Sequence, residues 1–210
     1  MLWQMKTMKT AWRVWLLLGL ACAPAPAAPA KAKPAPAAAV AAPAREPEIR
    51  HLDRKQDGAD LQRIWFYRKK LPEPFYRRNN FAWARAEIDG LDKKEYFAHS
   101  GIQSFEGLSA RAAKRIQGMS FSPAKGKGKF QTLFVDYLGN IDGPNALPRW
   151  FDTEYKILED IASRLPDPSV SGRIRLNTNL EACPSCRGVM RQFLAAYTNV
   201  EMLVLYEWPP

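Results

Sequence analysis

The segment from Phe151 to Trp208 decides the fold that the sequence predicts. It reads Phe151-Asp152-Thr153-Glu154-Tyr155-Lys156-Ile157-Leu158, then Ser171-Gly172-Arg173-Ile174-Arg175-Leu176, then Cys183-Pro184-Ser185-Cys186-Arg187, and it closes on Met202-Leu203-Val204-Leu205-Tyr206. Apolar residues at helical spacing follow Asp152 as far as Leu165, and a second such pattern covers residues 187–197. Short β-prone runs at 174–178 and 201–208 follow the two helices. We therefore expect helix, strand, helix and strand in this order.

The residues before this segment add a hairpin and further elements. Residues 81–88 alternate between two faces, Asp89-Gly90 forms a turn, and residues 94–100 supply the partner strand. We also expect a helix over 60–70, a short basic helix over 109–117, a Gly/Lys-rich loop over 120–129 and a strand over 130–137. This alternation of strands and helices predicts an α/β fold with a partly parallel or mixed sheet.

The N-terminal part of the chain predicts export. Residues 1–23 combine basic residues with an apolar run too short to span a bilayer, which is typical of a signal peptide. Residues 24–44 are almost entirely Ala and Pro and predict a disordered, extended linker. The folded domain is then 45–210, with a core over 81–208. We expect a secreted or periplasmic protein, with an uncleaved leader or a lipid on Cys22 as alternative attachments to a membrane.

The charge and the aromatic residues suggest a polyanionic partner. The formal net charge is +10, and residues 61–78 interleave basic and aromatic side chains. Single-stranded nucleic acid, DNA or RNA, binds such surfaces because bases stack and phosphates pair with cations. The alternative is a basic helix that packs its aromatic face on the core. The candidate nucleic-acid contacts are Trp65, Tyr67, Arg68, Lys69 and Lys127.

The Cys-x-x-Cys motif predicts a metal site. Cys183 and Cys186 at a helix start can face one metal ion, and the helix N-terminus favours their thiolate form. A catalytic zinc ion has three protein ligands and one open position. Asp152 is a candidate third ligand and His99 is its rival. Glu154, two residues after Asp152, would then act as general acid and base.

A plainer interpretation remains open for the same residues. Asp152 is a suitable helix N-cap, and Glu154 is a favourable acid in a first helical turn. Cys183 and Cys186 could form a disulfide in an oxidising compartment. The chain would then be a non-catalytic exported binding protein, with either this disulfide or a structural zinc ion.

Residues 152–162, Cys183-Pro184-Ser185-Cys186 and Phe193 resemble the bacterial polymorphic-toxin deaminases of the cytidine-deaminase-like superfamily. The hairpin over 83–101, which ends in Ala98-His99-Ser100-Gly101, resembles their opening strands. The signature of zinc deaminases is His-x-Glu followed by Pro-Cys-x-x-Cys. Here Asp152 replaces the His and Ala182 replaces the Pro, so the chain is an Asp-x-Glu variant.

The resemblance implies a three-layer α/β/α sandwich, one Zn²⁺ ion and hydrolytic deamination of a base, most often cytosine, in nucleic acid. It implies that Asp152, Cys183 and Cys186 bind zinc and that Glu154 shuttles protons. It further implies that His99 and Ser100 lie on the strand lining the base pocket. A toxin or effector role and a cognate immunity protein follow from the same resemblance. A deaminase of free nucleosides or nucleotides is a weaker alternative.

Overall fold

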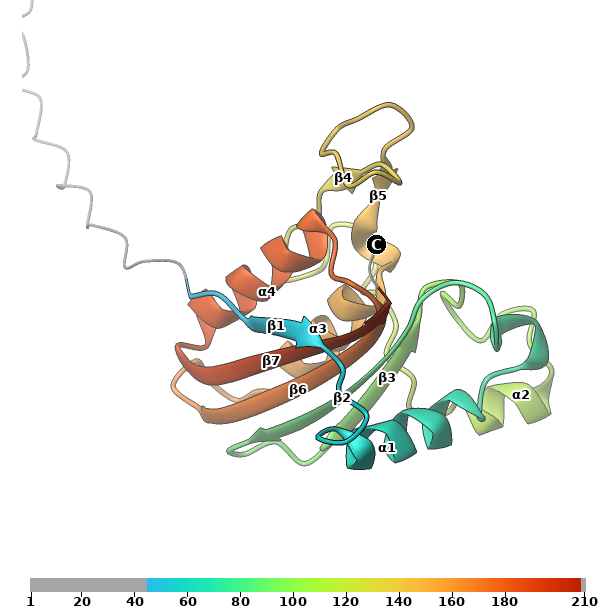
Figure 1. Ribbon diagram of the computed structural model, residues 1–210, viewed down its shortest axis with the longest axis horizontal. Helices are drawn as coiled ribbons and strands as arrows, with labels where there is room; N and C mark the ends of the chain where they lie inside the picture. Colours follow the sequence, from blue (N-terminus) through green and yellow to red (C-terminus); the bar gives the residue numbers. More distant parts are fainter. Residues whose placement is uncertain (1–44, 209–210) are drawn as a thin grey trace, which may run out of the picture. The chain divides into compact units, whose positions relative to one another are not determined.

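The computed structural model describes residues 45–208, so the predicted signal peptide 1–23, the linker 24–44 and Cys22 lie outside the described residues. Five strands form one sheet in the order β1-β7-β6-β2-β3 (Figure 1). β1 and β6 both run parallel to β7, whereas β2 runs antiparallel to β6 and to β3. The sheet is therefore mixed, as the sequence predicts. Its strands are β1 (Glu48–His51), β2 (Phe81–Ile88), β3 (Glu95–His99), β6 (Ser171–Leu180) and β7 (Asn199–Trp208).

Helices cover both faces of this sheet. α3 (Thr153–Ala162) and α4 (Pro184–Ala196) share one apolar core with one face, and α1 (Gly58–Arg68) and α2 (Ala110–Arg115) flank the other (Figure 1). The period of two in β2 explains this division. Its alanines, all fully buried, face α3, while Phe81 and Trp83 face the α1 side. Small side chains on the inner face let α3 pack close to the sheet.

A small second sheet joins β4 (Phe134–Val135) to β5 (Leu147–Pro148). The predicted strand over 130–137 is therefore wrong except at these two residues. Its backbone groups find side-chain partners in the helices instead. The Phe130 N–H donates to the Glu159 carboxylate at 2.8 Å, and the Leu133 N–H donates to the Ser185 hydroxyl at 2.9 Å. Such bonds compete with a strand ladder.

The other predicted elements are confirmed, with ends that move by a few residues. The structure adds β1, which the sequence did not indicate because its four residues show no alternation of apolar and polar side chains. Glu48 of β1 pairs with Leu203 of β7. Within residues 45–208, no helix combines the length and the apolar character needed to span a bilayer.

The pairing of β2 with β6 is expected to tolerate only glycine at position 172. Its φ of +150° disfavours other residues, and an added Cβ would lie 2.1 Å from the Glu87 carbonyl oxygen. Gly172→Ala should lower the free energy of unfolding by about 2 kcal/mol or more, measured by chemical denaturation. The matched control is Gly188→Ala in α4, where the added Cβ meets no atom within 4 Å. This change should raise stability by about 1 kcal/mol. A Gly172→Ala protein as stable as wild type would contradict the register.

Candidate metal centre

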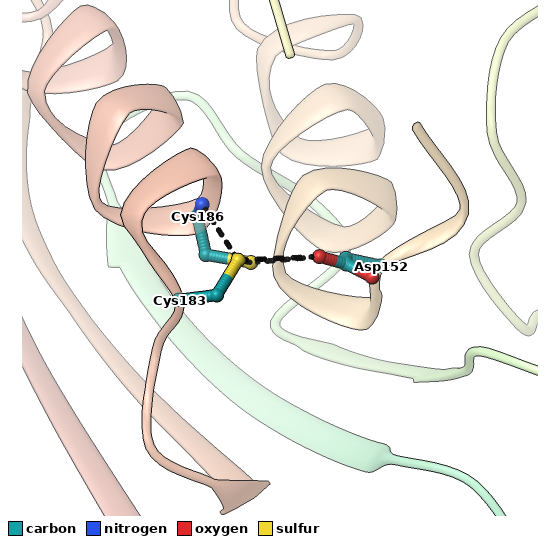
Figure 2. A group of neighbouring side chains, drawn as sticks. All are labelled: Asp152, Cys183 and Cys186. Atoms are coloured by element: carbon teal, nitrogen blue, oxygen red, sulfur yellow. Dashed lines mark hydrogen bonds between the residues drawn. The ribbon is translucent and has the colours of Figure 1, made fainter. Parts of the chain in front are cut away.

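The N-termini of α3 and α4 lie side by side, and each is preceded by one residue of the Asp-x-Glu and Cys-x-x-Cys motifs (Figure 2). Cys183 occupies the N-cap position of α4, and Pro184 fits the first turn because it has no N–H to leave unpaired. The Cys183 sulfur accepts a hydrogen bond from the Cys186 N–H at 3.4 Å. This capping turn brings both sulfurs to the same end of the helix, where its dipole favours anions.

Asp152, Cys183 and Cys186 form a compact cluster (Figure 2). Asp152 Oδ2 lies 3.5 Å from the Cys183 sulfur and 3.3 Å from the Cys186 sulfur. The two sulfurs are 3.4 Å apart, and both cysteines are free thiols, not a disulfide. Around a tetrahedral zinc ion, two sulfurs and an oxygen would lie about 3.5 to 3.8 Å from one another. The cluster thus has the ligand types and nearly the spacing that zinc requires, with one position left open.

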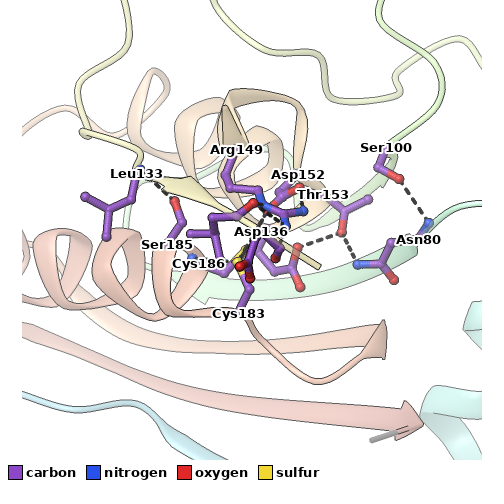
Figure 3. Close-up of polar contacts among 12 residues, drawn as sticks. Asn80, Ser100, Leu133, Asp136, Arg149, Asp152, Thr153, Cys183, Ser185 and Cys186 are labelled. Atoms are coloured by element: carbon purple, nitrogen blue, oxygen red, sulfur yellow. Dashed lines mark hydrogen bonds and ion pairs between the residues drawn. The ribbon is translucent and has the colours of Figure 1, made fainter. Parts of the chain in front are cut away.

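Asp152 does not cap α3. It occupies the N-cap position, yet its side chain makes no capping hydrogen bond. One carboxylate oxygen instead faces the sulfurs, and the other lies 3.9 Å from Arg149 Nη1. Arg149 in turn donates to the backbone carbonyls of Val135 and Asp136 (Figure 3). The side chain of Asp152 is therefore turned toward the thiols, which the capping interpretation does not explain.

The cluster concentrates acidic groups. Burial raises the pKa of Asp152, and burial followed by the charge of Asp152 raises the pKa of Glu154. The pKa of Cys186 is raised by its hydrogen bond with Cys183, by burial and by the charges of Glu154 and Asp152. A divalent cation at this point would stabilise the ionised forms of all these groups. The chemistry of the donor set therefore fits a metal ion.

Glu154 lines a pocket of about 760 Å³ that the three cluster residues also line. The residue is only 2% exposed. Its two carboxylate oxygens accept hydrogen bonds from the hydroxyls of Thr153, at 2.8 Å, and Thr178, at 3.0 Å. A buried carboxylate and a candidate metal site thus line the same cavity, which is large enough for a nucleotide.

Aromatic and basic residues make up about half of the pocket lining. Ser100, Trp65 and Arg68, all predicted from the sequence, belong to it. Arg68 forms a salt bridge with Glu207 at 3.0 Å. Arg77 and Arg78 are exposed and form no salt bridge among the described residues. The remaining aromatic and basic lining residues are Phe75, Tyr76, Phe81, Arg149, Phe151 and Trp208.

His99 lies outside both the cluster and the pocket lining. The side chain is fully buried, its Nδ1 accepts from the Gly101 N–H at 3.1 Å, and its Nε2 then donates to the Arg78 carbonyl at 2.8 Å. Both ring nitrogens are occupied by backbone groups, and burial lowers the pKa of the ring. We therefore correct the assignment of His99 from rival ligand or base contact to a residue that supports the turn beside the pocket.

Three of the predicted nucleic-acid contacts also lie elsewhere. The Tyr67 hydroxyl donates to Glu95 at 2.9 Å, and its ring packs on Phe97, on the core side of α1. Lys69 lines neighbouring surface grooves, and Lys127 lines a separate groove beside Glu159 and Asp160. Of the five predicted contacts, Trp65 and Arg68 line the pocket. For Trp65 and Tyr67 the rotation of α1 decides this, since residues two apart face different sides of a helix.

Sequence reasoning missed the polar residues that support the site. Lys156 is fully buried on α3 and donates to the carbonyls of His99, at 2.9 Å, and Ile102, at 2.7 Å. Burial lowers its pKa to about 7. Asn80, directly before β2, contacts the hydroxyls of Thr153 and Thr178. In the sequence, the only indication of a role was position: Lys156 lies close to the Asp-x-Glu motif, and Asn80 lies at a strand end.

The matching family model places the site in a wider context. A model described as Toxin-deaminase, the BURPS668_1122 family of deaminases, matches residues 66–208, about two thirds of the chain. No curated protein and no solved structure matches the chain. The matched range contains the metal cluster, Glu154 and every lining residue of the pocket except Trp65.

Proposed function

The chain belongs to the BURPS668_1122 family of toxin deaminases, and from this premise we propose that it is a zinc-dependent hydrolytic deaminase of cytosine in single-stranded nucleic acid. The observation that carries this proposal is the meeting of one carboxylate and two thiols beside a second carboxylate in one pocket. Three ligands and an open position are typical of a catalytic zinc site, whereas structural sites use four ligands.

The residues of the chain divide the reaction between them. Asp152, Cys183 and Cys186 would hold the ion. Zinc bound there would supply the Lewis acidity that activates a water molecule for attack on C4 of cytosine. Glu154 accepts one proton from the attacking water and donates it to the ring nitrogen, then accepts the remaining hydroxyl proton and donates it to the amino group, which leaves as ammonia. The net reaction consumes one water and replaces the amino group with a carbonyl. Burial of Glu154 excludes bulk water from these transfers.

The pocket wall supports a nucleic-acid substrate. Arg77 and Arg78 are exposed at its rim, where phosphates could pair with them, and Trp65 is 48% exposed, which leaves a face on which a base could stack. The target atom of a base is inaccessible inside a duplex, so the substrate base must be unpaired or flipped out.

The biological setting is also a proposal. Membership of a toxin-deaminase family supports a toxin or effector role, and the signal-like leader supports export to the periplasm or out of the cell. A toxin that modifies nucleic acid endangers its producer, so we also propose a cognate immunity protein as a partner.

A substrate panel tests the activity. The full-length chain, loaded with zinc, should convert cytosine to uracil in single-stranded oligonucleotides, with slower conversion in duplexes. Single-stranded DNA, duplex DNA, single-stranded RNA and free cytidine would be compared by mass spectrometry of the products. Conversion of cytidine alone would favour the free-nucleoside alternative. Absence of conversion in every substrate would contradict the proposed function.

Substitution of two arginines tests whether the basic residues of the pocket lining bind the nucleic acid. Arg77→Ala combined with Arg78→Ala should raise KM for an oligonucleotide about tenfold at low salt, because two phosphate contacts are lost, and leave KM for cytidine unchanged. Lys125→Ala combined with Lys127→Ala is the matched control, since it removes the same charge outside the pocket lining. An equal effect of the control would indicate non-specific attraction only.

A further inference from the structure

Glu154 is held by hydrogen bonds that continue beyond its direct partners. Each of its carboxylate oxygens accepts from one threonine hydroxyl, Thr153 for Oε2 and Thr178 for Oε1. Both hydroxyls in turn accept from a single group, the side-chain amide of Asn80, with Nδ2 at 2.9 Å from each oxygen. Figure 3 shows Asn80 pointing at Thr153 from the end of the neighbouring strand. The three supporting residues come from three separate parts of the fold: the residue before β2, α3 and β6.

The direction of each bond is determined by the number of hydrogens available. The Asn80 NH₂ group is a donor with two hydrogens, and a threonine hydroxyl has only one. Once Asn80 donates to both hydroxyls, each hydroxyl hydrogen is free to point at Glu154. The alternative direction, from Thr178 to Asn80 Oδ1, spans 3.3 Å, longer than the 3.0 Å bond to Glu154.

The orientation of the Asn80 amide is itself set by the backbone. Its Oδ1 accepts from the N–H groups of Asn179, at 3.1 Å, and Leu180, at 3.3 Å. A flipped amide would direct its NH₂ group at these two N–H donors and leave the hydroxyls facing an oxygen. The backbone at the end of β6 therefore fixes the direction of every bond up to Glu154.

We propose that Asn80, Thr153 and Thr178 are positioning residues that form a relay, which keeps both oxygens of Glu154 as hydrogen-bond acceptors and fixes the plane of its carboxylate. The inference rests on the proposed role of Glu154 in proton transfer. A carboxylate whose two oxygens each receive a fixed hydrogen bond cannot rotate, so its remaining lone pairs keep one direction toward the reacting atoms.

Kinetics of Thr178 variants provide the first test. Thr178 is 2% exposed and does not line the pocket, so it can act on the substrate only through its neighbours. Thr178→Val removes the hydroxyl and keeps the shape. It should lower kcat about tenfold or more, the effect of a hydrogen bond to a charged group, with KM within about twofold of wild type. Thr178→Ser, which restores the hydroxyl, should recover most of kcat. A Thr178→Val protein with wild-type kcat would overturn the relay.

A second test needs no activity. In the zinc-loaded full-length chain, Thr178→Val should raise the equilibrium constant for unfolding about tenfold, because one oxygen of Glu154 loses its donor. In a Glu154→Met background the same change should raise it less than about threefold, since no carboxylate remains to be satisfied. Equal effects in the two backgrounds would overturn the relay.

The two tests separate the failure of the relay from the failure of the proposed function. A wild-type chain that deaminates nothing, together with unequal effects in the two backgrounds, would refute the activity and support the relay. An active wild-type chain with equal effects in both backgrounds would refute the relay alone.

Discussion

Glu154→Gln is expected to lower the kcat of deamination by about 10³-fold or more, the upper part of the range for the loss of a general acid and base. Glutamine has the shape of glutamate but cannot accept and return a proton. Among residues 45–208, Glu154 is the one buried carboxylate outside the metal cluster that lines this pocket, and its oxygens are bonded to Thr153 and Thr178. The measurement is kcat on the best substrate of the panel.

The fold and the metal should survive this substitution. Burial raises the pKa of Glu154, so its ionised form is unfavourable in the free protein, and a neutral amide removes that cost. The NH₂ group of glutamine cannot accept from one of the two threonine hydroxyls, which offsets this gain, so the unfolding midpoint should stay close to that of wild type, with unchanged zinc content.

The matched control for Glu154→Gln is Glu159→Gln on the same helix. Glu159 is also buried, but its carboxylate accepts from the backbone N–H groups of Lys129 and Phe130, away from the pocket. Glu159→Gln should lower stability by about 1 to 3 kcal/mol and keep kcat within a few-fold of wild type. More than a tenth of the wild-type kcat in Glu154→Gln would refute its assigned role.

The full-length chain is expected to contain about one zinc ion, and removal of any cluster ligand should lower this content. Cys183→Ala and Cys186→Ala each leave two ligands and should lose the ion almost entirely, while Asp152→Ala should weaken its binding strongly. The control is His99→Gln, which should keep the metal because His99 is bonded to the backbone of Arg78 and Gly101. Elemental analysis of purified protein gives the stoichiometry.

Proton release provides an independent measure of the same site. The raised pKa of Cys186 means that its thiol carries a proton at neutral pH before metal binds. Zinc addition to chelator-treated protein should therefore release about one proton or more, seen as a dependence of the calorimetric heat on the buffer. Loss of zinc in His99→Gln with retention in Asp152→Ala would move the third ligand to the hairpin.

The site was predictable where its chemistry is local in sequence. A carboxylate two residues before Glu154 and two cysteines three residues apart each mark the start of a helix, and helix starts have recognisable signals. The α/β class followed from the same periodicities. No feature of the sequence near either motif shows that the two motifs meet. They meet because α3 and α4 pack on the same face of the sheet.

The parts that were not predictable depend on tertiary partners. Asn80 and Thr178 are 98 positions apart, and their contact exists only because β2 pairs with β6. His99 was a reasonable ligand candidate by residue type, yet backbone groups of the chain occupy both of its nitrogens. The segment after Lys129 had β propensity, but carboxylate and hydroxyl groups of α3 and α4 took its N–H groups.

The position of β7 in the sheet determines how late in synthesis the sheet can be completed. β7 lies between β1 and β6. Glu48 of β1 can therefore pair with its partner only after Leu203 has been translated, 155 residues later. At typical translation speeds of about 5 to 20 residues per second, this interval lasts about 8 to 30 s. A ribosome-bound or prematurely terminated chain that lacks residues 199–208 has both cysteines of the cluster but not the strand that joins β1 to the rest of the sheet. An incomplete chain therefore has the side chains of the candidate site without the strand that completes the sheet beneath it, and we expect the folded site to form only after β7 has been added.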